Sequence, residues 1–269
     1  MWKRVFLFVV LLLGVRESML LPDGRLHLHI LDVGQGDAIF MVTPKGKQIL
    51  IDGGPDLSTL SHLGKLMPFF DRSIDLIVLT HSDADHITAL PEVLRRFHID
   101  TILLSGRLGN SGSVDALLAA LQESDTTIIT ANPQEDLSLD GVVLDVIWPT
   151  ADAIANNRFS NNNLSVVVRI VYNDHEILLT GDIEKSAEDA ILASGVDIQS
   201  DILKVAHHGS RTSSSTGFLL AVHPDIALIS VGRDNQYGHP HPSVLDRFHA
   251  LGIPIKTTAE EGVISLEFR

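Results

Sequence analysis

The hydrophobic residues of this chain fall into short continuous runs separated by polar turns, and the runs recur in the same order in both parts of the sequence. Three runs lie in the first half, at residues 48–54, 74–86 and 98–107, and three in the second, at residues 176–182, 201–210 and 223–233. The interval from His81 to His98 is 17 residues and that from His207 to His223 is 16. Runs rich in Leu, Ile and Val predict parallel strands buried on both faces, and their repetition predicts two similar halves.

Each half also opens with a pair of strands of partly alternating pattern, at residues 26–32 with 38–43 and at residues 142–148 with 165–172. Helices are predicted between the strands, at residues 87–97, 113–122, 183–194, 215–222 and 243–250. Two β-rich halves with helices on their outer sides pack most simply as a four-layer αββα sandwich, an α/β (α+β) fold. Corresponding strand ends of the two halves would then meet along one edge.

The N-terminal residues carry a separate signal. Lys3 and Arg4 precede an apolar run at residues 5–15, which Arg16 and Glu17 end. Eleven residues match the apolar region of a signal peptide and fall short of the roughly 20 that span a bilayer. We therefore expect residues 1–25 to be a signal peptide or an N-terminal membrane anchor, residues 26–269 to form one domain, and the protein to be exported to the periplasm or the extracellular space. No A-x-A cleavage site follows, so an uncleaved anchor, or a stub left by a larger membrane protein, stays open.

Composition and charge limit the chemistry. The content of 45% hydrophobic and 20% charged residues is ordinary for a soluble α/β domain, and the lack of cysteine excludes disulfides, thiolate metal sites and a cysteine nucleophile. The formal net charge of −14 repels polyanions and argues against a broad nucleic-acid-binding face. Aromatic residues make up 5% of the chain, so platforms for base stacking are scarce. A local phosphate site centred on metal ions is still compatible with these numbers.

Four potential metal ligands lie in one turn directly after the apolar strand at residues 74–80. They are His81, Asp83, Asp85 and His86. In α/β folds the groups that bind ligands project from the carboxyl ends of parallel strands, which is where this turn lies. The predicted fold brings three further regions to the same edge: the loops at residues 32–37 and 52–54, and the strand ends of the second half.

The strand ends of the second half supply Asp182, His207 and His208. A carboxylate such as that of Asp182 can bridge two cations, and the alternative for Asp182 is to cap the helix that follows. The two histidines follow a strand, and adjacent side chains on an extended backbone point to opposite faces. We therefore expect one of them to be a ligand and the other to act on a leaving group or to orient the first.

With these motifs the sequence resembles the metallo-β-lactamase superfamily and, within it, the hydrolase domain of ComEC-type DNA-uptake channel proteins. Residues 81–86 (HSDADH) match the family signature H-x-H-x-D-H with aspartate in place of the second histidine, a replacement typical of the ComEC-type branch. The resemblance covers residues 26–269. It also rests on DVGQGDA at residues 32–38, IDGG at 51–54, TGDIE at 180–184, LKVAHHGS at 203–210 and YGHPHP at 237–242.

The resemblance implies two divalent metal ions, manganese or zinc. His81 and Asp83 would bind the first ion, Asp85 and His86 the second, and Asp182 both. His208 is the expected remaining ligand of the second ion, which leaves His207 for the leaving group, although the opposite assignment stays open. Three carboxylates make the site rich in hard oxygen ligands, which favours manganese or magnesium relative to zinc more than an all-imidazole site would.

The chain departs from the wider superfamily at residues 161–165 (NNNLS), where a histidine would complete the first metal site. That site would lack one nitrogen ligand, and Asn162, Asn163 or Ser165 would contact substrate or simply form a turn. The complete set of residues expected to act is as follows: His207, Asp85 and His241 in catalysis, and Asn163, Ser165, Arg211 and His239 in substrate binding, with Lys204 and Arg233 as further cations for phosphate and Asp37 and Asp52 as supports.

The function implied is metal-dependent hydrolysis of phosphodiester bonds, as a nuclease or phosphodiesterase, by a hydroxide that the two metals generate. Single-stranded DNA is the substrate that the ComEC-type resemblance suggests, with a membrane or a DNA-uptake channel as partner. Hydrolysis of an ester, amide or lactam is the first alternative. A non-enzymatic module of an uptake apparatus is the second.

Overall fold

The strands form two sheets of seven that share one design. The computed structural model describes residues 2–269. It describes only the backbone of residues 3, 4, 7, 9, 10, 12 and 13. The first sheet has the order β14 (Ile264–Phe268), β1 (Leu26–Ile30), β2 (Ile39–Val42), β3 (Gln48–Ile51), β4 (Ser73–Leu79), β5 (His98–Leu104) and β6 (Thr127–Thr130). The second has the order β13 (Ile255–Thr257), β12 (Ile226–Ile229), β11 (Ile202–Lys204), β10 (His175–Leu179), β9 (Val167–Tyr172), β8 (Val142–Trp148) and β7 (Leu137–Leu139).

The repeat in the sequence is a repeat of topology. Strands β3 to β6 pair in parallel, and so do β10 to β13. The other pairings, β1 with β2, β2 with β3, β7 with β8, β8 with β9 and β9 with β10, are antiparallel. One strand breaks the correspondence. The last strand, β14, returns to the first sheet and pairs with β1, with Leu26 opposite Phe268.

Three apolar layers confirm the four-layer αββα arrangement. The middle layer lies between the sheets and contains Leu28 and Val78 from the first sheet and Val168 from the second. The two outer layers lie between each sheet and its helices, with Ile77 against the helices of the first half and Leu178 against those of the second. Neighbouring residues of β4 thus enter different layers, which explains why the strand reads as a continuous apolar run.

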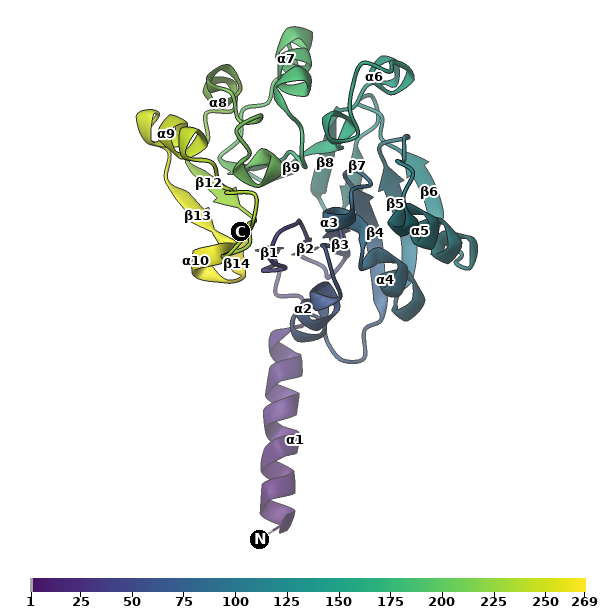
Figure 1. Cartoon of the computed structure of the whole chain (residues 1–269). Helices are drawn as coiled ribbons and strands as arrows, with labels where there is room; N and C mark the ends of the chain where they lie inside the picture. Colours follow the sequence, from purple (N-terminus) through teal and green to yellow (C-terminus); the bar gives the residue numbers. More distant parts are fainter. Residues whose placement is uncertain (1) are drawn as a thin grey trace.

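The described residues form ten helices, most of which lie on the outer faces of the sheets (Figure 1). They are α1 (Trp2–Met19), α2 (Ser58–Leu66), α3 (Ala84–Ile87), α4 (Leu90–Arg96), α5 (Gly112–Gln122), α6 (Ala151–Ala155), α7 (Lys185–Ser194), α8 (Thr216–Val222), α9 (Pro242–Ala250) and α10 (Thr258–Glu261), with the short 3₁₀ turns η1 (Asn162–Leu164) and η2 (Ala206–Gly209). The helix predicted at residues 87–97 begins later, as α4, and the separate short helix α3 ends at Ile87. The Thr88 N–H is shared between the carbonyls of Gly54 at 3.1 Å and Ala84 at 3.2 Å, and Pro91 in the first turn of α4 has no N–H with which to continue α3.

The first helix, α1, projects away from the sandwich (Figure 1). It is attached through its last turn, where Arg16 donates to the carbonyls of Gly64 and Lys65, and Glu17 accepts the N–H of Phe69. No helix among residues 2–269 is both long and apolar enough to cross a membrane.

Candidate metal centre

Carboxyl ends of strands from both halves meet between the two sheets. Asp52 follows β3, His81 follows β4, Asp182 follows β10, and His208 lies in η2 after β11. Figure 1 shows α3, which begins within the HSDADH turn, at the centre of the molecule between the two halves. The structure thus brings together the loops that the sequence analysis placed at one edge.

Four side chains form a compact cluster: Asp85, His86, Asp182 and His208. The Asp182 Oδ2 atom lies 3.4 Å from His86 Nε2 and 3.5 Å from His208 Nε2. Asp85 Oδ2 lies 3.4 Å from His208 Nε2. Atoms that bind one zinc-like ion tetrahedrally, each at about 2.0–2.2 Å, lie about 3.3–3.6 Å from one another. These three separations fit ligands of one ion, and His86 Nε2 and Asp85 Oδ2 are slightly farther apart, at 3.9 Å.

Unpartnered buried atoms give an independent test of whether the cluster fits a metal. The Nε2 atoms of His81, His86 and His208, and Oδ1 of Asp182, are all buried and have no hydrogen-bond partner. Leaving a buried polar atom unpaired costs about 1–3 kcal/mol, and native proteins nearly always avoid it. A divalent cation would satisfy all these atoms, so the donor set fits a metal.

The electrostatics of the cluster point the same way. Burial opposes charge on His208, but the carboxylates of Asp182 and Asp37 outweigh it and raise the pKa of His208 to about 10. Burial likewise opposes charge on Asp182, but His208 and His86 hold the pKa of its carboxyl well below its usual range. The cluster thus carries an excess of negative charge that needs a positive partner, a proton or a metal ion.

His81 and Asp83 form a more open pair beside this cluster. The His81 Nε2 atom lies 3.7 Å from Asp83 Oδ2, and the rings of His81 and His86 are 4.1 Å apart. Burial lowers the pKa of His81 to about 4, so its imidazole is neutral and suited to bind a metal. Asn161 reaches this pair and donates from Nδ2 to Asp83 Oδ1. The sequence does not single out Asn161, because nothing in it distinguishes this residue from its two neighbouring asparagines.

Asp52 holds the first-half ligands in place, as predicted. Its Oδ1 accepts the Thr80 N–H at 2.8 Å and its Oδ2 accepts the Thr80 hydroxyl at 2.7 Å. The same Oδ2 lies 2.7 Å from His86 Nδ1. A carboxylate on Nδ1 fixes the tautomer that leaves Nε2 as the metal-binding atom.

Asp37 supports the second-half ligand in a similar way. His208 Nδ1 lies 3.0 Å from the Ser230 carbonyl and 3.4 Å from Asp37 Oδ1. The other oxygen of Asp37 accepts from Lys204 Nζ at 2.6 Å, and both side chains are buried. The prediction that Lys204 binds phosphate is therefore wrong, because its ammonium group is enclosed and already paired.

The backbone at His207 and His208 differs from the expectation of an extended segment. Both residues have positive φ angles, 52° and 54°. The His207 N–H donates to the Gly181 carbonyl at 3.1 Å, which ties this turn to the loop that carries Asp182. As a result both rings face Asp182. His208 is buried, and His207 is partly exposed with Nε2 at 3.8 Å from Asp182 Oδ2.

Asn163 and Ser165 have structural contacts rather than open positions. The Asn163 Oδ1 atom accepts the N–H groups of Glu184 and Ala187, and its Nδ2 donates to Ser160 and Glu184. These bonds use both hydrogens of the amide. Ser165 is fully buried and accepts the Asp182 N–H at 3.1 Å. The two residues hold the Asp182 loop, and their contact with substrate stays a prediction.

Asp182 does not cap the following helix. The residue at the N-cap of α7 is Glu184, and Asp182 lies two residues earlier with its carboxylate in the cluster. The capping alternative is therefore excluded, and the side chain is available to a metal.

The other predicted site residues lie around the cluster. The His239 ring is 5.8 Å from that of His207. His241 Nδ1 accepts the Ser243 N–H and caps α9, which gives it a structural contact that the sequence analysis did not foresee. Arg211 is exposed, and its role stays a prediction.

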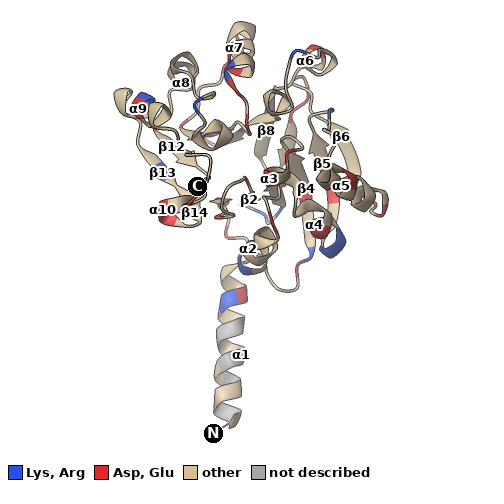
Figure 2. Ribbon diagram, in the orientation of Figure 1, with Lys and Arg blue, Asp and Glu red and all other residues tan. Residues whose placement is uncertain are grey.

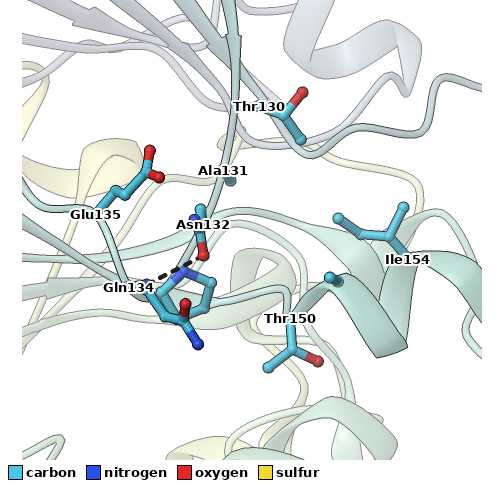
Figure 3. A pocket seen from close by; sticks show the side chains of 9 residues that line it. Thr130, Ala131, Asn132, Gln134, Glu135, Thr150 and Ile154 are labelled. Carbon is cyan, nitrogen blue, oxygen red and sulfur yellow. Dashed lines mark hydrogen bonds between the residues drawn. The ribbon is translucent and has the colours of Figure 1, made fainter.

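One sizeable pocket lies away from the cluster (Figure 3). It has a volume of about 470 Å³ and is lined by residues from the end of β6 and the start of α6, including Asn132, Glu135 and Ile154. It contains no Lys or Arg and none of the cluster residues. The candidate chemistry therefore lies elsewhere.

Residues 31–148 match the model of the metallo-beta-lactamase superfamily. That segment contains the HSDADH turn and its supporting loops. This segment is similar to the metallo-β-lactamase superfamily. The structure of the metallo-beta-lactamase fold protein YhfI from Bacillus subtilis shares the fold, with a TM-score of 0.60 at 12% identity over 90% of this chain and 99% of that one.

Two sequence relatives refine this placement. The chain is 30% identical over 260 residues to ComE operon protein 3 of Bacillus subtilis (strain 168), which covers 90% of this chain and 33% of that protein. It is 36% identical over 99 residues to ribonuclease Z of Clostridium kluyveri, which covers 37% of this chain and 26% of that protein. The chain thus spans about a third or less of the length of these relatives.

Proposed function

We propose that this protein is a metal-dependent hydrolase of phosphodiester bonds that acts through two divalent ions, manganese or zinc. The observation that carries the proposal is the set of unpartnered, buried Nε2 and carboxylate atoms that converge on Asp182 from both halves. Two ions held there would supply a nucleophile near neutral pH and would neutralise charge on both the attacking and the leaving oxygen.

The residue types favour a phosphodiester over a carbonyl substrate. The candidate ligands include three carboxylates, those of Asp83, Asp85 and Asp182. Such hard oxygen ligands favour a hard cation such as manganese, which also binds phosphate oxygens. The similarity to ComE operon protein 3, and to a relative whose name, ribonuclease Z, denotes a nuclease, supports the same choice. Hydrolysis of an ester, amide or lactam is the rival activity.

The chain's own residues divide the remaining work. Asp182 would orient the candidate ligands His86 and His208, because its carboxylate lies beside both. His207 is partly exposed beside Asp182 and would give a proton to the leaving oxygen. Arg211 and His239, on the loops around the cluster, would contact the rest of the substrate.

We propose single-stranded DNA as the polymeric substrate. The protein would contact a short stretch of the strand and not an extended length of it. The charged residues in Figure 2 support this choice, because Lys and Arg occur in short, separated segments along the described chain. A strand would therefore be held mainly at the metals. We further propose that residues 1–25 direct export and associate with a membrane or a DNA-uptake channel.

The direct test uses the full chain with manganese, zinc or magnesium. We expect it to cleave bis(p-nitrophenyl) phosphate and single-stranded DNA, and not the lactam nitrocefin. His81→Ala should lose this activity, whereas His98→Ala, which changes an exposed histidine, should retain it. Absence of phosphodiester turnover with all three metals, or equal turnover by His81→Ala, would overturn the proposal.

Metal analysis gives a second readout that needs no substrate. Protein loaded with manganese or zinc and then dialysed should retain up to two ions per chain. Fewer than one ion under every loading condition would favour a non-enzymatic module instead.

A further inference from the structure

A second pocket lies beside the candidate metal centre, between the end of β12 and helices α9 and α10. Its volume is about 580 Å³, within the range of pockets that hold small organic ligands. Val231, Leu245 and Ile255 supply apolar lining. Polar groups, including Arg233 and Glu260, also line it. The pocket thus combines an apolar lining with both a hydrogen-bond donor and an acceptor.

One side chain, His239, connects this pocket to the metal centre. His239 lines the pocket, and its ring is 5.8 Å from that of His207. His207 in turn lies 3.8 Å from Asp182. A group attached to the leaving oxygen at the metals would therefore extend past His207 and His239 into the pocket.

The wall that carries His239 is held in a fixed shape. The Asn235 Nδ2 atom donates to the carbonyls of Gly232 and His239, and its Oδ1 accepts the N–H groups of Tyr237 and His239. The loop is also tied to the η2 turn, because the His241 N–H donates to the Gly209 carbonyl at 2.8 Å. A preformed wall of this kind reduces the entropy lost when a ligand binds.

The charges of the pocket favour a ring with donors and acceptors over a simple anion. Arg233 donates from Nε to the Ala259 carbonyl, and among the described residues no carboxylate oxygen lies within 4.0 Å of its guanidinium. Glu260 accepts from the Thr257 hydroxyl. An isolated phosphate would gain from Arg233 but would be repelled by Glu260.

A nucleobase satisfies all these features. Its faces are apolar enough for Leu245 and Ile255, its edge carries donors and acceptors, and bases stack on histidine, tyrosine and arginine side chains. Tyr237 is stacked on His239 at a centroid distance of 5.8 Å and extends the aromatic surface outward. The pocket of Figure 3 has no Lys or Arg and no aromatic or histidine side chain in its lining, so it does not offer this combination.

We propose that this pocket binds the nucleoside on the leaving side of the scissile phosphate. The proposal rests on the proposed phosphodiesterase function and makes it specific for nucleotides. A substrate that carries a nucleoside at this position gains contacts that bis(p-nitrophenyl) phosphate does not make. We expect the pocket to accept different bases. Its lining offers apolar contacts and one donor–acceptor pair, too few hydrogen-bonding groups to match the whole edge of one base.

The experiment compares two substrates in the full-length, manganese-loaded protein. The first is a dinucleotide in which two thymidines share one phosphodiester, and the second is bis(p-nitrophenyl) phosphate. Two variants alter the pocket: Leu245→Trp fills it, and Arg233→Gln removes the cation at an exposed position that tolerates change. Leu118→Trp, on the exposed face of α5 in the other half, is the matched control.

We expect the ratio of kcat/KM for the dinucleotide to that for bis(p-nitrophenyl) phosphate to fall at least about tenfold in both pocket variants and to stay constant in Leu118→Trp. A ratio within twofold of wild type in both variants would overturn the proposal. If Leu245→Trp does not fold, Arg233→Gln decides the result alone.

A binding measurement separates failure of the pocket from failure of the proposed function. Thymidine 5′-monophosphate is titrated into chelator-treated protein, where no turnover occurs. Saturable binding that weakens at least about tenfold in both variants supports the pocket even if neither ester is hydrolysed. Binding that is absent, or equal in wild type and variants, contradicts it even if both esters are hydrolysed.

Discussion

The two halves of the sandwich have matching parallel strands but contribute to the candidate metal centre in different ways. The first half provides four candidate ligands within six consecutive residues, from His81 to His86. The second half provides Asp182 and His208 from two separate strand ends. One half therefore builds a local ligand turn, and the other completes the site by placing two single side chains opposite it.

The halves also differ in how their ligands are supported. His86 is held by Asp52, and both lie in the first half. His208 is held by Asp37, which belongs to the first half and is itself paired with Lys204 of the second. The His86 ring can thus be positioned within its own half, whereas the His208 ring depends on contact between the two halves.

Asp182 should be the most sensitive point, because its carboxylate serves ligands from both halves. Asp182→Asn keeps the shape and removes the charge, and we expect kcat/KM for bis(p-nitrophenyl) phosphate to fall by at least about 10³-fold, equivalent to the several kcal/mol that metal catalysis supplies. The loss should exceed that of His81→Ala, which affects the first pair alone. Steady-state kinetics with parallel metal analysis checks this, and full metal content with near-normal activity in Asp182→Asn would contradict it.

Removing the metals should loosen the junction between the halves. At a free metal concentration of 100 times Kd, binding stabilises the folded state by about 2.7 kcal/mol, so a chelator should lower Tm by roughly 5–10 °C. Differential scanning calorimetry measures the change. A double variant, His81→Ala with Asp182→Asn, should show a much smaller shift, and an equal shift would mean that the chelator acts at another place.

Lys204 tests whether the second-half ligand depends on the first half. Replacing Lys204 alone would leave Asp37 as an unpaired buried charge, so the informative variant is Lys204→Met with Asp37→Asn. We expect its affinity for manganese to fall about 10–100-fold, as for other residues that orient metal ligands. Competition with a metal-binding dye gives the Kd. Lys185→Met, at an exposed ion pair, is the control, and an unchanged Kd in the double variant would show that the pair is only structural.

The smallest effect, a change in the pH dependence of stability, is expected where β14 pairs with β1. Burial lowers the pKa of His29 on β1 to about 4, and its Nδ1 contacts the Ser265 hydroxyl of β14. A depressed pKa favours the neutral form in the folded state, so stability is lost as pH falls below about 6.5. Between pH 7.5 and 5.5, wild type should lose about 1 kcal/mol more of its free energy of unfolding than His29→Gln. Urea denaturation at both pH values measures this, and parallel pH profiles would refute it.

The sequence was most informative where ligands and pattern are local. The HSDADH turn, the apolar strands and the repeat of strand order depend on neighbouring residues, and the structure shows the turn at the predicted strand end and the two halves in the predicted sandwich. The supporting role of Asp52 was also accessible, because it follows a strand parallel to β4.

Distant contacts set the features that the sequence did not reveal. The left-handed backbone at His207 and His208 depends on a bond to Gly181, and the burial of Lys204 depends on Asp37, 167 residues away. Asn161 acquires its contact with Asp83 only when the halves pack together. Local propensity contains no information about such partners, so the sequence does not reveal the backbone conformation of the two histidines, the burial of Lys204 or the contact of Asn161.

The pairing of β14 with β1 has a consequence for how such a domain can be combined with others. Because Leu26 and Phe268 are opposite each other, the first and last strands of the sandwich are hydrogen-bonded neighbours. A fold whose entry and exit points lie side by side can be spliced into a host polypeptide at a single position without opening its core. The sandwich is therefore built as a transferable unit, whose attachment to a larger assembly would constrain one edge and leave the metal centre between the two halves undisturbed.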